Sequence, residues 1–457
     1  MLDDTIAAIA TPIGEGGLAV IRISGAQALA VADAIFSPSG KNSVKPSAAV
    51  SHTIQFGHIV RDGKTIDEVL LAVMLAPRTF TREDIVEITC HGGILPAKMV
   101  LDAALAGGAR LAEPGEFTRR AFLNGRIDLA QAEAVADLIH SRTELALSAA
   151  NEQLAGKLSQ RINQLRDDLL KTLAHVEAYI DFPEEDIAEE TKDQLLARLD
   201  HGVSFMDDLL RTADEGQILR RGIRAAIIGR PNAGKSSLLN QLLGHDRAIV
   251  SPIPGTTRDT IEETANIRGL PVVFIDTAGL REARDEIEVE GIRRSRESLQ
   301  KAEFILHVLD VSEPVTEADT LYLREFSNQK RIIVCNKRDL PPKFLVREDF
   351  EDIPIIDISC KTGEGIEFLK DAIKNLVWSG EIKTEMLQVM INSRHQDALN
   401  RARESTQRAL AALRSGATLE LAAMDLRIAV NAVGEIVGKT ATEDLLDMIF
   451  SQFCIGK

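Results

Sequence analysis

The stretch Gly229-Arg-Pro-Asn-Ala-Gly-Lys-Ser236 has the residue types and spacing of a phosphate-binding loop. Its glycines let backbone N–H groups wrap a phosphate, and the helix expected to follow points its positive end at the same group. Lys235 can reach the β- and γ-phosphates of a nucleotide, and the Ser236 hydroxyl can ligate Mg²⁺. The predicted contacts of this loop are Asn232, Ala233, Gly234, Lys235, Ser236 and Ser237.

Three further motifs follow in chain order, and the second of them favours GTP over ATP. Asp276-Thr-Ala-Gly279 can hold Mg²⁺ through water and sense the γ-phosphate with the Gly279 amide. Asn336-Lys-Arg-Asp339 offers a carboxylate that can accept both guanine N–H donors, a pattern that adenine does not satisfy, and Ser359-Cys-Lys361 can support the base with main-chain groups. The predicted contacts are Asp276, Thr277, Ala278, Gly279, Asn336, Lys337, Asp339, Ser359, Cys360 and Lys361.

A polar segment containing Gly and Pro, residues 249–259, lies between the first two motifs. It is placed to close over the γ-phosphate, and Thr257 is the natural second hydroxyl ligand for Mg²⁺. We expect this switch loop to order in the triphosphate state and to loosen after hydrolysis.

The residue after Gly279 is Leu280, where the familiar signalling GTPases have a glutamine that positions the attacking water. Because leucine neither orients water nor accepts a proton, catalysis must use another group. The acidic run Glu286-Ile-Glu288-Val-Glu290 contains a candidate, although such a run is also typical of a solvated segment.

Apolar runs predict the elements that position these motifs. In residues 221–379, short runs alternate with helical stretches, which indicates a parallel sheet covered on both faces. The flanks are helical: from Leu154 to Ile180 an apolar residue recurs every three or four positions. We therefore expect a GTP-binding (G) domain inserted into a helical domain. The strands expected in it are 223–229, 271–276, 304–310, 331–336 and 353–359.

The N-terminal part has a different texture, with short β-rich runs between glycines and prolines, which predicts a small α/β or α+β domain. Its expected strands are 17–24, 52–60, 68–75 and 84–90. The predicted domains are residues 1–120, residues 121–220 together with 380–457, and residues 221–379.

Composition narrows the classes of function. The net charge of −16 argues against a broad basic surface, so any RNA contact is expected to be local or shared with a partner. The four cysteines form no C-x-x-C pair, which argues against a zinc site and a disulfide framework. No run approaches the ~20 apolar residues of a membrane span, and the acidic start is unlike a signal peptide. We expect a cytoplasmic protein.

The G-domain region resembles the TrmE-Era-EngA-like GTPases, and the whole chain resembles the tRNA modification GTPase MnmE (TrmE) family. This resemblance implies a multidomain α/β and α fold, with an N-terminal folate-binding-like α+β domain. A helical-bundle domain would follow, interrupted by an inserted Ras-like P-loop GTPase domain. The motifs that carry the resemblance are ATPIGEGGLAVIRISG (10–25), CHGG (90–93), EPGEFTRRAFLNGRIDLAQAEAVADLI (113–139), IDFPEED (180–186) and FCIGK (453–457).

For catalysis, the resemblance implies a K⁺ ion in place of an arginine finger, lying against the phosphates and neutralising developing charge. Its ligands would be Asn232, Ser251, Ile253 and Thr256. The alternative for Asn232 is that it only stabilises the turn of the phosphate loop. Ser251 departs from a threonine of the family but keeps the hydroxyl. Ser251, Thr256 and Thr257 would complete the nucleotide contacts.

In the same family, the position of Glu288 orients the catalytic water through a second water, so the catalytic residues implied are Glu288, Lys235 and Thr257. The resemblance also implies that the G domains of two protomers meet across their switch loops. Hydrolysis would then be coupled to G-domain dimerisation.

The N-terminal domain of this family is similar to folate-binding one-carbon enzymes, dimerises the protein and binds 5-formyltetrahydrofolate or a related tetrahydrofolate. The contacts implied are Arg22, Glu87, Arg126 and Lys457. A carboxylate can accept pterin N–H groups and cations can meet the glutamate tail. Arg126 departs from the lysine of that position, which keeps the charge but changes the geometry. Cys454 is either a nucleophile or a small packed residue.

The family acts with a flavin-binding partner, MnmG (GidA), in a heterotetramer. Together they would install an aminomethyl or carboxymethylaminomethyl group on C5 of the wobble uridine of tRNA, with a folate one-carbon unit as the methylene source. Two other functions stay open: a ribosome-assembly GTPase switch, and a freestanding folate transferase with a regulatory G domain.

Overall fold

The computed structural model describes residues 4–40, 43–182, 189–244, 262–275, 301–316, 319–320, 323–324, 329–344, 353–378 and 389–457. These residues fall into two compact units. The first comprises residues 1–136, 159–199 and 405–457, and the second comprises residues 137–158 and 200–404. This division is coarser than the three domains predicted from the sequence, whose boundaries stay a prediction.

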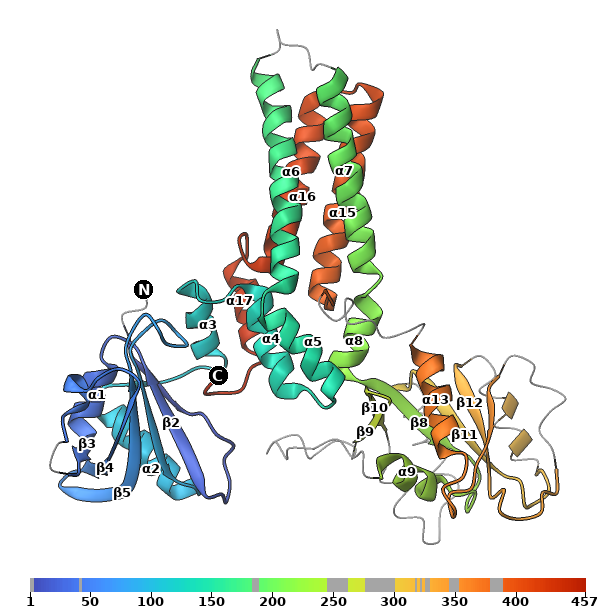
Figure 1. The fold of residues 1–457 in the computed structure, drawn as a ribbon, viewed down its shortest axis with the longest axis horizontal. Coiled ribbons are helices and arrows are strands. Elements are labelled where there is room, and N and C mark those ends of the chain that lie inside the picture. Colours follow the sequence, from blue (N-terminus) through green and yellow to red (C-terminus); the bar gives the residue numbers. More distant parts are fainter. Residues whose placement is uncertain are drawn as a thin grey trace. The chain divides into compact units, whose positions relative to one another are not determined.

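The first unit begins with a seven-stranded sheet of order β3-β4-β5-β6-β2-β1-β7. Four of its strands, β2 to β5, are labelled in Figure 1. One face packs on α1 (Ala28–Ile35) and α2 (Ile94–Ala106), because alternate strand residues such as Ile21 and Leu71 point into that core. The four strands predicted from alternation are confirmed, and three short ones were missed. The strands are β1 (Ile6–Ile9), β2 (Leu18–Ser24), β3 (Phe36–Pro38), β4 (Thr53–Arg61), β5 (Lys64–Met74), β6 (Ile85–His91) and β7 (Arg110–Leu111).

On the opposite face of this sheet, β2, β4 and β5 carry exposed apolar side chains. Leu18 and Ile54 are each 68% exposed, and Phe56 and Leu70 are nearly half exposed. Arg22 and Glu87 lie on the same face, because they pair across β2 and β6 in the register that pairs Leu18 with His91. An apolar sheet face of this kind is typical of a surface that another molecule covers. We call it the open sheet face.

Helices make up the rest of the first unit, and parts of α6, α7, α15 and α16 lie side by side there (Figure 1). The predicted apolar stripe is confirmed on α6, where Leu158, Ile162 and Val176 are fully buried. Ion pairs join α6 to α16 and α15 to α16. The other helices that lie wholly or partly in this unit are α3 (Glu116–Leu123), α4 (Leu129–His140), α6 (Lys157–Asp181), α7 (Glu189–Leu210), α15 (Ser393–Ser415), α16 (Leu419–Val437) and α17 (Glu443–Phe450).

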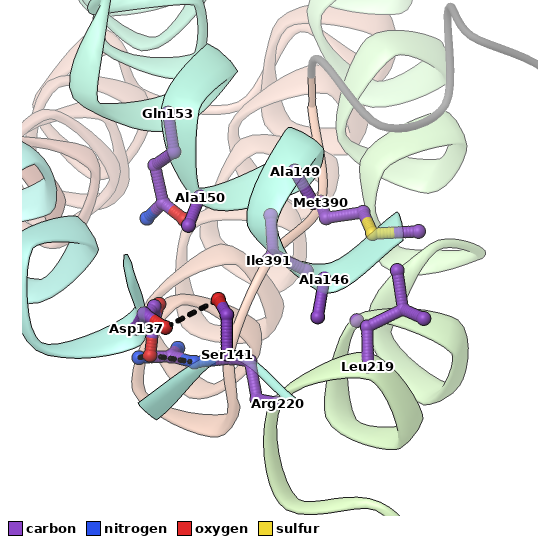
Figure 2. A pocket seen from close by; sticks show the side chains of 11 residues that line it. Asp137, Ser141, Ala146, Ala149, Ala150, Gln153, Leu219, Arg220, Met390 and Ile391 are labelled. Carbon is purple, nitrogen blue, oxygen red and sulfur yellow. Dashed lines mark hydrogen bonds and ion pairs between the residues drawn. The ribbon is translucent and has the colours of Figure 1, made fainter. Parts of the chain in front are cut away.

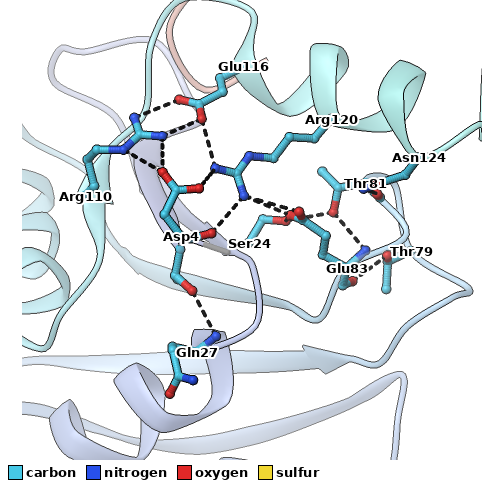
Figure 3. A network of polar contacts seen from close by, with 11 residues as sticks. Asp4, Ser24, Gln27, Thr79, Thr81, Glu83, Arg110, Glu116, Arg120 and Asn124 are labelled. Atoms are coloured by element: carbon cyan, nitrogen blue, oxygen red, sulfur yellow. Dashed lines mark hydrogen bonds and ion pairs between the residues drawn. The ribbon is translucent and has the colours of Figure 1, made fainter. Parts of the chain in front are cut away.

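A buried arginine fixes the chain start, α3 and the loop before β6 together (Figure 3). The Arg120 side chain is 1% exposed, and its guanidinium donates to Asp4 at 2.7 Å, Glu116 at 2.9 Å and Glu83 at 3.2 Å. Arg110 donates to Asp4 at 2.6 Å and to Glu116 at 2.7 Å. A charge this deeply buried is tolerated because several carboxylates compensate it.

The second unit contains a six-stranded sheet of order β13-β12-β11-β8-β10-β9. β8 pairs in parallel with β10 and β11, and β12 continues the parallel arrangement, whereas β9 is antiparallel. Every residue of β11 and β12 is buried, as expected for central parallel strands. All five predicted strands are confirmed, and β9 was missed. The strands are β8 (Ile223–Ile228), β9 (Glu263–Ile267), β10 (Leu270–Phe274), β11 (Phe304–Asp310), β12 (Arg331–Asn336) and β13 (Ile355–Asp357).

Four helices are described around this sheet: α5 (Glu144–Leu154), α8 (Ala213–Arg221), α9 (Lys235–Leu243) and α13 (Ile366–Val377). An apolar cluster joins Ala146 of α5 and Leu219 of α8 to Leu270, Trp378 and Met390. Figure 2 shows the small cavity beside it, where Arg220 pairs with Asp137 at 2.7 Å. The helices that precede the inserted sheet and the chain that follows it near Met390 therefore share one apolar cluster with it.

Within the part of the chain that the structure describes, every helix is too short or too polar to cross a lipid bilayer.

Two of the carboxylates around Arg120, Glu116 and Asp4, are held in the charged form. Burial on its own raises the pKa of Glu116, but hydrogen bonds from Arg110, the Glu113 amide and Arg120 outweigh it, so the pKa lies below its usual value. The pKa of Asp4 is lowered in the same way by the two arginines, against burial. Groups with lowered pKa values stabilise the fold above their unfolded pKa of about 4, and this stabilisation is lost as pH falls through the folded value.

We predict that Arg120→Met lowers the free energy of unfolding of the first unit by about 3 kcal/mol, because it leaves buried carboxylates uncompensated. Amide hydrogen exchange of β2 and β6 measures this loss. Below about pH 4 the difference from the wild-type chain should shrink, since the carboxylates are then protonated.

Arg110→Met is the matched control, because its side chain is 44% exposed and it shares two carboxylates with Arg120. Its expected cost is about 1 kcal/mol or less. Equal losses in the two variants would show that burial of Arg120 adds nothing.

Candidate functional site

The phosphate loop lies between β8 and α9, as the sequence predicts, at the point where β8 has neighbours on both sides. Both of its glycines are required by geometry. Gly229 has φ 146°, and a Cβ atom there would lie 2.3 Å from the Val308 carbonyl oxygen. Gly234 has φ 101° and directly precedes α9. The N–H groups of the first turn of that helix, which have no partner within the helix, therefore lie at the phosphate loop.

Lys235 is folded onto this loop. Its Nζ donates to the carbonyl oxygens of Gly229 and Arg230, both at 2.9 Å. Burial lowers the pKa of its ammonium group. A half-buried cation held by two carbonyls is well placed to exchange them for phosphate oxygens, which are stronger partners.

Asn232 adopts a left-handed backbone with φ 63°, a conformation that asparagine tolerates better than most residues. This accounts for an asparagine in the turn by itself. Its role as a potassium ligand therefore stays a prediction.

Asn336 joins the phosphate loop to the predicted guanine-binding loop. Its Nδ2 donates to the Ala233 carbonyl at 2.9 Å, and its Oδ1 accepts from the Cys360 amide at 3.1 Å. A Cβ atom on Gly234 would lie 2.1 Å from Asn336 Nδ2, so only glycine fits beside this contact. Three of the predicted motifs thus meet through one side-chain amide.

Asp339 is held by the last motif. Ser359 Oγ donates to its Oδ1 at 2.8 Å and accepts from the Thr362 amide at 3.2 Å. Burial, and then Asp339, raise the pKa of the Cys360 thiol to about 11, so Cys360 stays a neutral thiol at neutral pH. Lys361 follows on the exposed surface. The arrangement suits a carboxylate that reads a base, with main-chain groups as support.

Several predicted site residues lie outside the described residues, and their roles stay predictions. They are Ser251, Ile253, Thr256, Thr257, Asp276, Thr277, Ala278, Gly279 and Glu288.

Sequence reasoning missed two charged residues at this site, Arg230 in the phosphate loop and Asp310 at the end of β11. Asp310 Oδ2 accepts from Lys337 Nζ at 2.6 Å and lies 3.8 Å from Arg230 Nη2. An acidic residue at the carboxyl end of a buried strand was the available signal.

A second candidate site lies in the first unit, on the open sheet face. Arg22 pairs with Glu87 at 2.8 Å, lies 5.6 Å from the centre of the Phe117 ring and donates to the Gly456 carbonyl at 3.4 Å. The C-terminal tail is held there, because Ile455 bridges to Pro114. The structure therefore brings together Arg22, Glu87 and the tail that carries Lys457.

Arg126 occupies a parallel position. Its guanidinium lies 5.6 Å from the centre of the Phe80 ring and donates to the Thr79 carbonyl at 2.8 Å. Phe80 packs on the same small apolar cluster as Phe117, so both arginines stack on neighbouring rings. Sequence reasoning missed both phenylalanines. Cys454 is exposed, and its carbonyl accepts from the Lys457 amide at 3.3 Å.

Two family models together match most of the chain. Residues 5–126 match the family model described as GTP-binding protein TrmE N-terminus. Residues 129–454 match the model described as MnmE helical domain. Among solved structures, the G domain of the T. maritima FeoB iron transporter aligns with 34% of this chain and 98% of its own, at 28% identity and a TM-score of 0.26. That structural similarity is too low to support an argument.

Curated relatives match over the full length. The tRNA modification GTPase MnmE of Geobacillus kaustophilus is 48% identical over 99% of both chains. The protein of the same name from Bacillus subtilis is 47% identical over 99% of this chain and 100% of its own. Together with the two domain matches, this similarity shows that the chain belongs to the tRNA modification GTPase MnmE family.

Proposed function

We propose that this chain hydrolyses GTP and uses the turnover to modify tRNA. The observation that carries the proposal is the contact of Asn336 with both the phosphate loop and Cys360, beside an Asp339 carboxylate fixed by Ser359. This arrangement supports phosphates at one end and a guanine at the other. Family membership favours tRNA modification over a ribosome-assembly switch or a freestanding folate transferase.

Mg²⁺ would be held by the hydroxyls of Ser236 and Thr257, which are hard oxygen donors of the kind that Mg²⁺ prefers. Ser236 lies in the first turn of α9, directly after the phosphate loop. Mg²⁺ would neutralise charge on the β- and γ-phosphates, and Lys235 would add a second positive charge at the same oxygens.

K⁺ would be held around Asn232, Ser251, Ile253 and Thr256, and Glu288 would orient the attacking water. Leucine at position 280, in place of a water-positioning glutamine, supports a mechanism of this kind. Association of two G domains would complete the site, so that hydrolysis follows dimerisation.

A reduced folate would be held by Arg22, Glu87, Arg126 and Lys457. The donor set fits such a ligand: Glu87 is a carboxylate that can accept pterin N–H groups, and the two arginines lie on neighbouring aromatic rings. Their cations suit the carboxylates of a glutamate tail. The folate would supply a one-carbon unit for the modified base.

The open sheet face supports a homodimer through the N-terminal domain, because its exposed apolar side chains are suited to burial against a second copy. The flavoprotein MnmG would be the partner in a heterotetramer, and it would supply much of the tRNA surface that an acidic chain of net charge −16 lacks. With tRNA as substrate, the protein would act in the cytoplasm.

We also propose that the domain boundaries lie near residues 120, 220 and 380.

Loss of the protein should remove the modification at C5 of the wobble uridine. Mass spectrometry of tRNA nucleosides from cells lacking the gene measures it, with complementation by the wild-type gene as control. Normal wobble uridines together with immature ribosomal subunits would instead indicate the assembly switch.

Replacing K⁺ with Na⁺ should slow GTP turnover by at least about tenfold, because a cation fitted to the phosphates would be lost from the transition state. Phosphate release at constant ionic strength measures the rate, and GDP affinity in the same salts is the control. Equal rates in both salts would exclude the potassium role.

Glu288→Ala should slow hydrolysis by roughly 100-fold while leaving GTP binding near normal, because it removes the group that orients water. Single-turnover kinetics separates the chemical step from binding. Glu286→Ala, a neighbouring acid of the same run, is the control that should keep wild-type turnover. If both variants hydrolyse GTP like wild type, another residue orients the water.

A further inference from the structure

A buried carboxylate lies between the two loops that would hold the ends of the nucleotide. Asp310, the last residue of β11, is 4% exposed. Its Oδ2 accepts from Lys337 Nζ at 2.6 Å, and its Oδ1 accepts from the amide and hydroxyl of Ser312 at 3.0 and 2.6 Å. Both carboxylate oxygens are therefore engaged, and one of them holds a cation of the guanine-binding loop.

The same carboxylate also faces the phosphate loop. Arg230 Nη2 lies 3.8 Å from Asp310 Oδ2, and Nη1 of the same guanidinium lies 3.7 Å from Asp319. Arg230 is the second residue of the loop, and its side chain is only 16% exposed. In a poorly hydrated position, charges at these distances attract strongly. The phosphate loop is thus tied to the end of β11 as well as to Asn336.

Lys337 combines an uncommon backbone conformation with a side chain that is held at its tip. Its backbone is left-handed, with φ 68°, which is uncommon for a residue with a long side chain. The ion pair to Asp310 fixes the ammonium end, while the side chain as a whole stays 34% exposed. A lysine held at its tip offers its aliphatic stem as a surface for a flat base.

Asp310 is ionised at neutral pH. Burial on its own raises the pKa of this carboxyl, but hydrogen bonds from Lys337 and Ser312 outweigh burial and lower it. The charge that attracts both cations is therefore present under ordinary conditions.

We propose that Asp310 is a positioning residue for the guanine nucleotide, which holds Lys337 of the base loop and Arg230 of the phosphate loop in one arrangement. The proposal rests on the guanine-reading role given above to residues 336–339. It adds a residue outside all the nucleotide motifs. Because both carboxylate oxygens of Asp310 already accept hydrogen bonds from Lys337 and Ser312, its effect on the nucleotide would pass through Lys337 and Arg230.

The first test is the affinity of the full-length chain for GDP, measured by calorimetry in Mg²⁺ without K⁺. Asp310→Asn keeps the size of the side chain and removes its charge, so GDP should bind about tenfold more weakly. Glu313→Gln is the matched control: Glu313 lies on the same loop, is 56% exposed and pairs only loosely with Lys343 at 3.8 Å. Its affinity should stay within about twofold of wild type.

A double-mutant cycle distinguishes positioning from a general loss of structure. If Asp310 acts through Lys337, the double variant Asp310→Asn/Lys337→Met should bind GDP no more weakly than the weaker single variant. A cycle with Arg230→Met should give the same non-additivity for the phosphate loop.

Unchanged GDP affinity in Asp310→Asn, or losses that add to about 100-fold in both cycles, would overturn the proposal. Preference for GDP over ADP is measured in parallel on the wild-type chain. Equal affinity for the two would overturn the guanine-reading role itself, and this inference with it. A retained guanine preference together with additive losses would reject the role of Asp310 alone.

Discussion

The side-chain amide of Asn336 is the contact on which the nucleotide site depends. Its Nδ2 donates to the phosphate loop and its Oδ1 accepts from the loop after β13. Because one side chain contacts both loops, neither loop is positioned independently. The requirement extends to the neighbouring residue, because any side chain on Gly234 would collide with the amide. A site assembled in this way is set by the packing of β8, β12 and β13 in one sheet rather than by its loops alone.

Each of the two units contains a buried ion cluster that joins segments distant in sequence. Arg120 gathers carboxylates from the chain start, the loop before β6 and α3, while Asp310 gathers cations from two nucleotide loops. In both cases a single buried charge organises segments that are distant in sequence. Such charges add specificity of arrangement more surely than they add stability, since removing them from water is costly. Both lie beside a candidate site, where a defined arrangement matters.

The sequence allowed prediction of those features that local patterns determine. Strands such as β11 were found because a fully buried parallel strand is a continuous apolar run, and the phosphate loop because its chemistry is contained in eight neighbouring residues. β9 was missed because ETANI mixes polar and apolar residues on an antiparallel edge strand. The roles of Arg120 and Asp310 were missed because their partners lie far along the chain, and an isolated charge in a sequence resembles a surface residue.

The packing of α8 against the chain near residue 391 has a consequence for how an inserted domain is accommodated. Gly216 lies so close to the Ile391 backbone that a Cβ atom would be 2.4 Å from its carbonyl oxygen. The chain enters the six-stranded sheet just after α8 and reaches α15 just after Ile391. The segments that lead into and out of the inserted domain are therefore in contact. An insertion whose ends meet costs its host little loop-closure entropy. The same junction therefore marks where the inserted domain can be excised and the helices rejoined by a short linker.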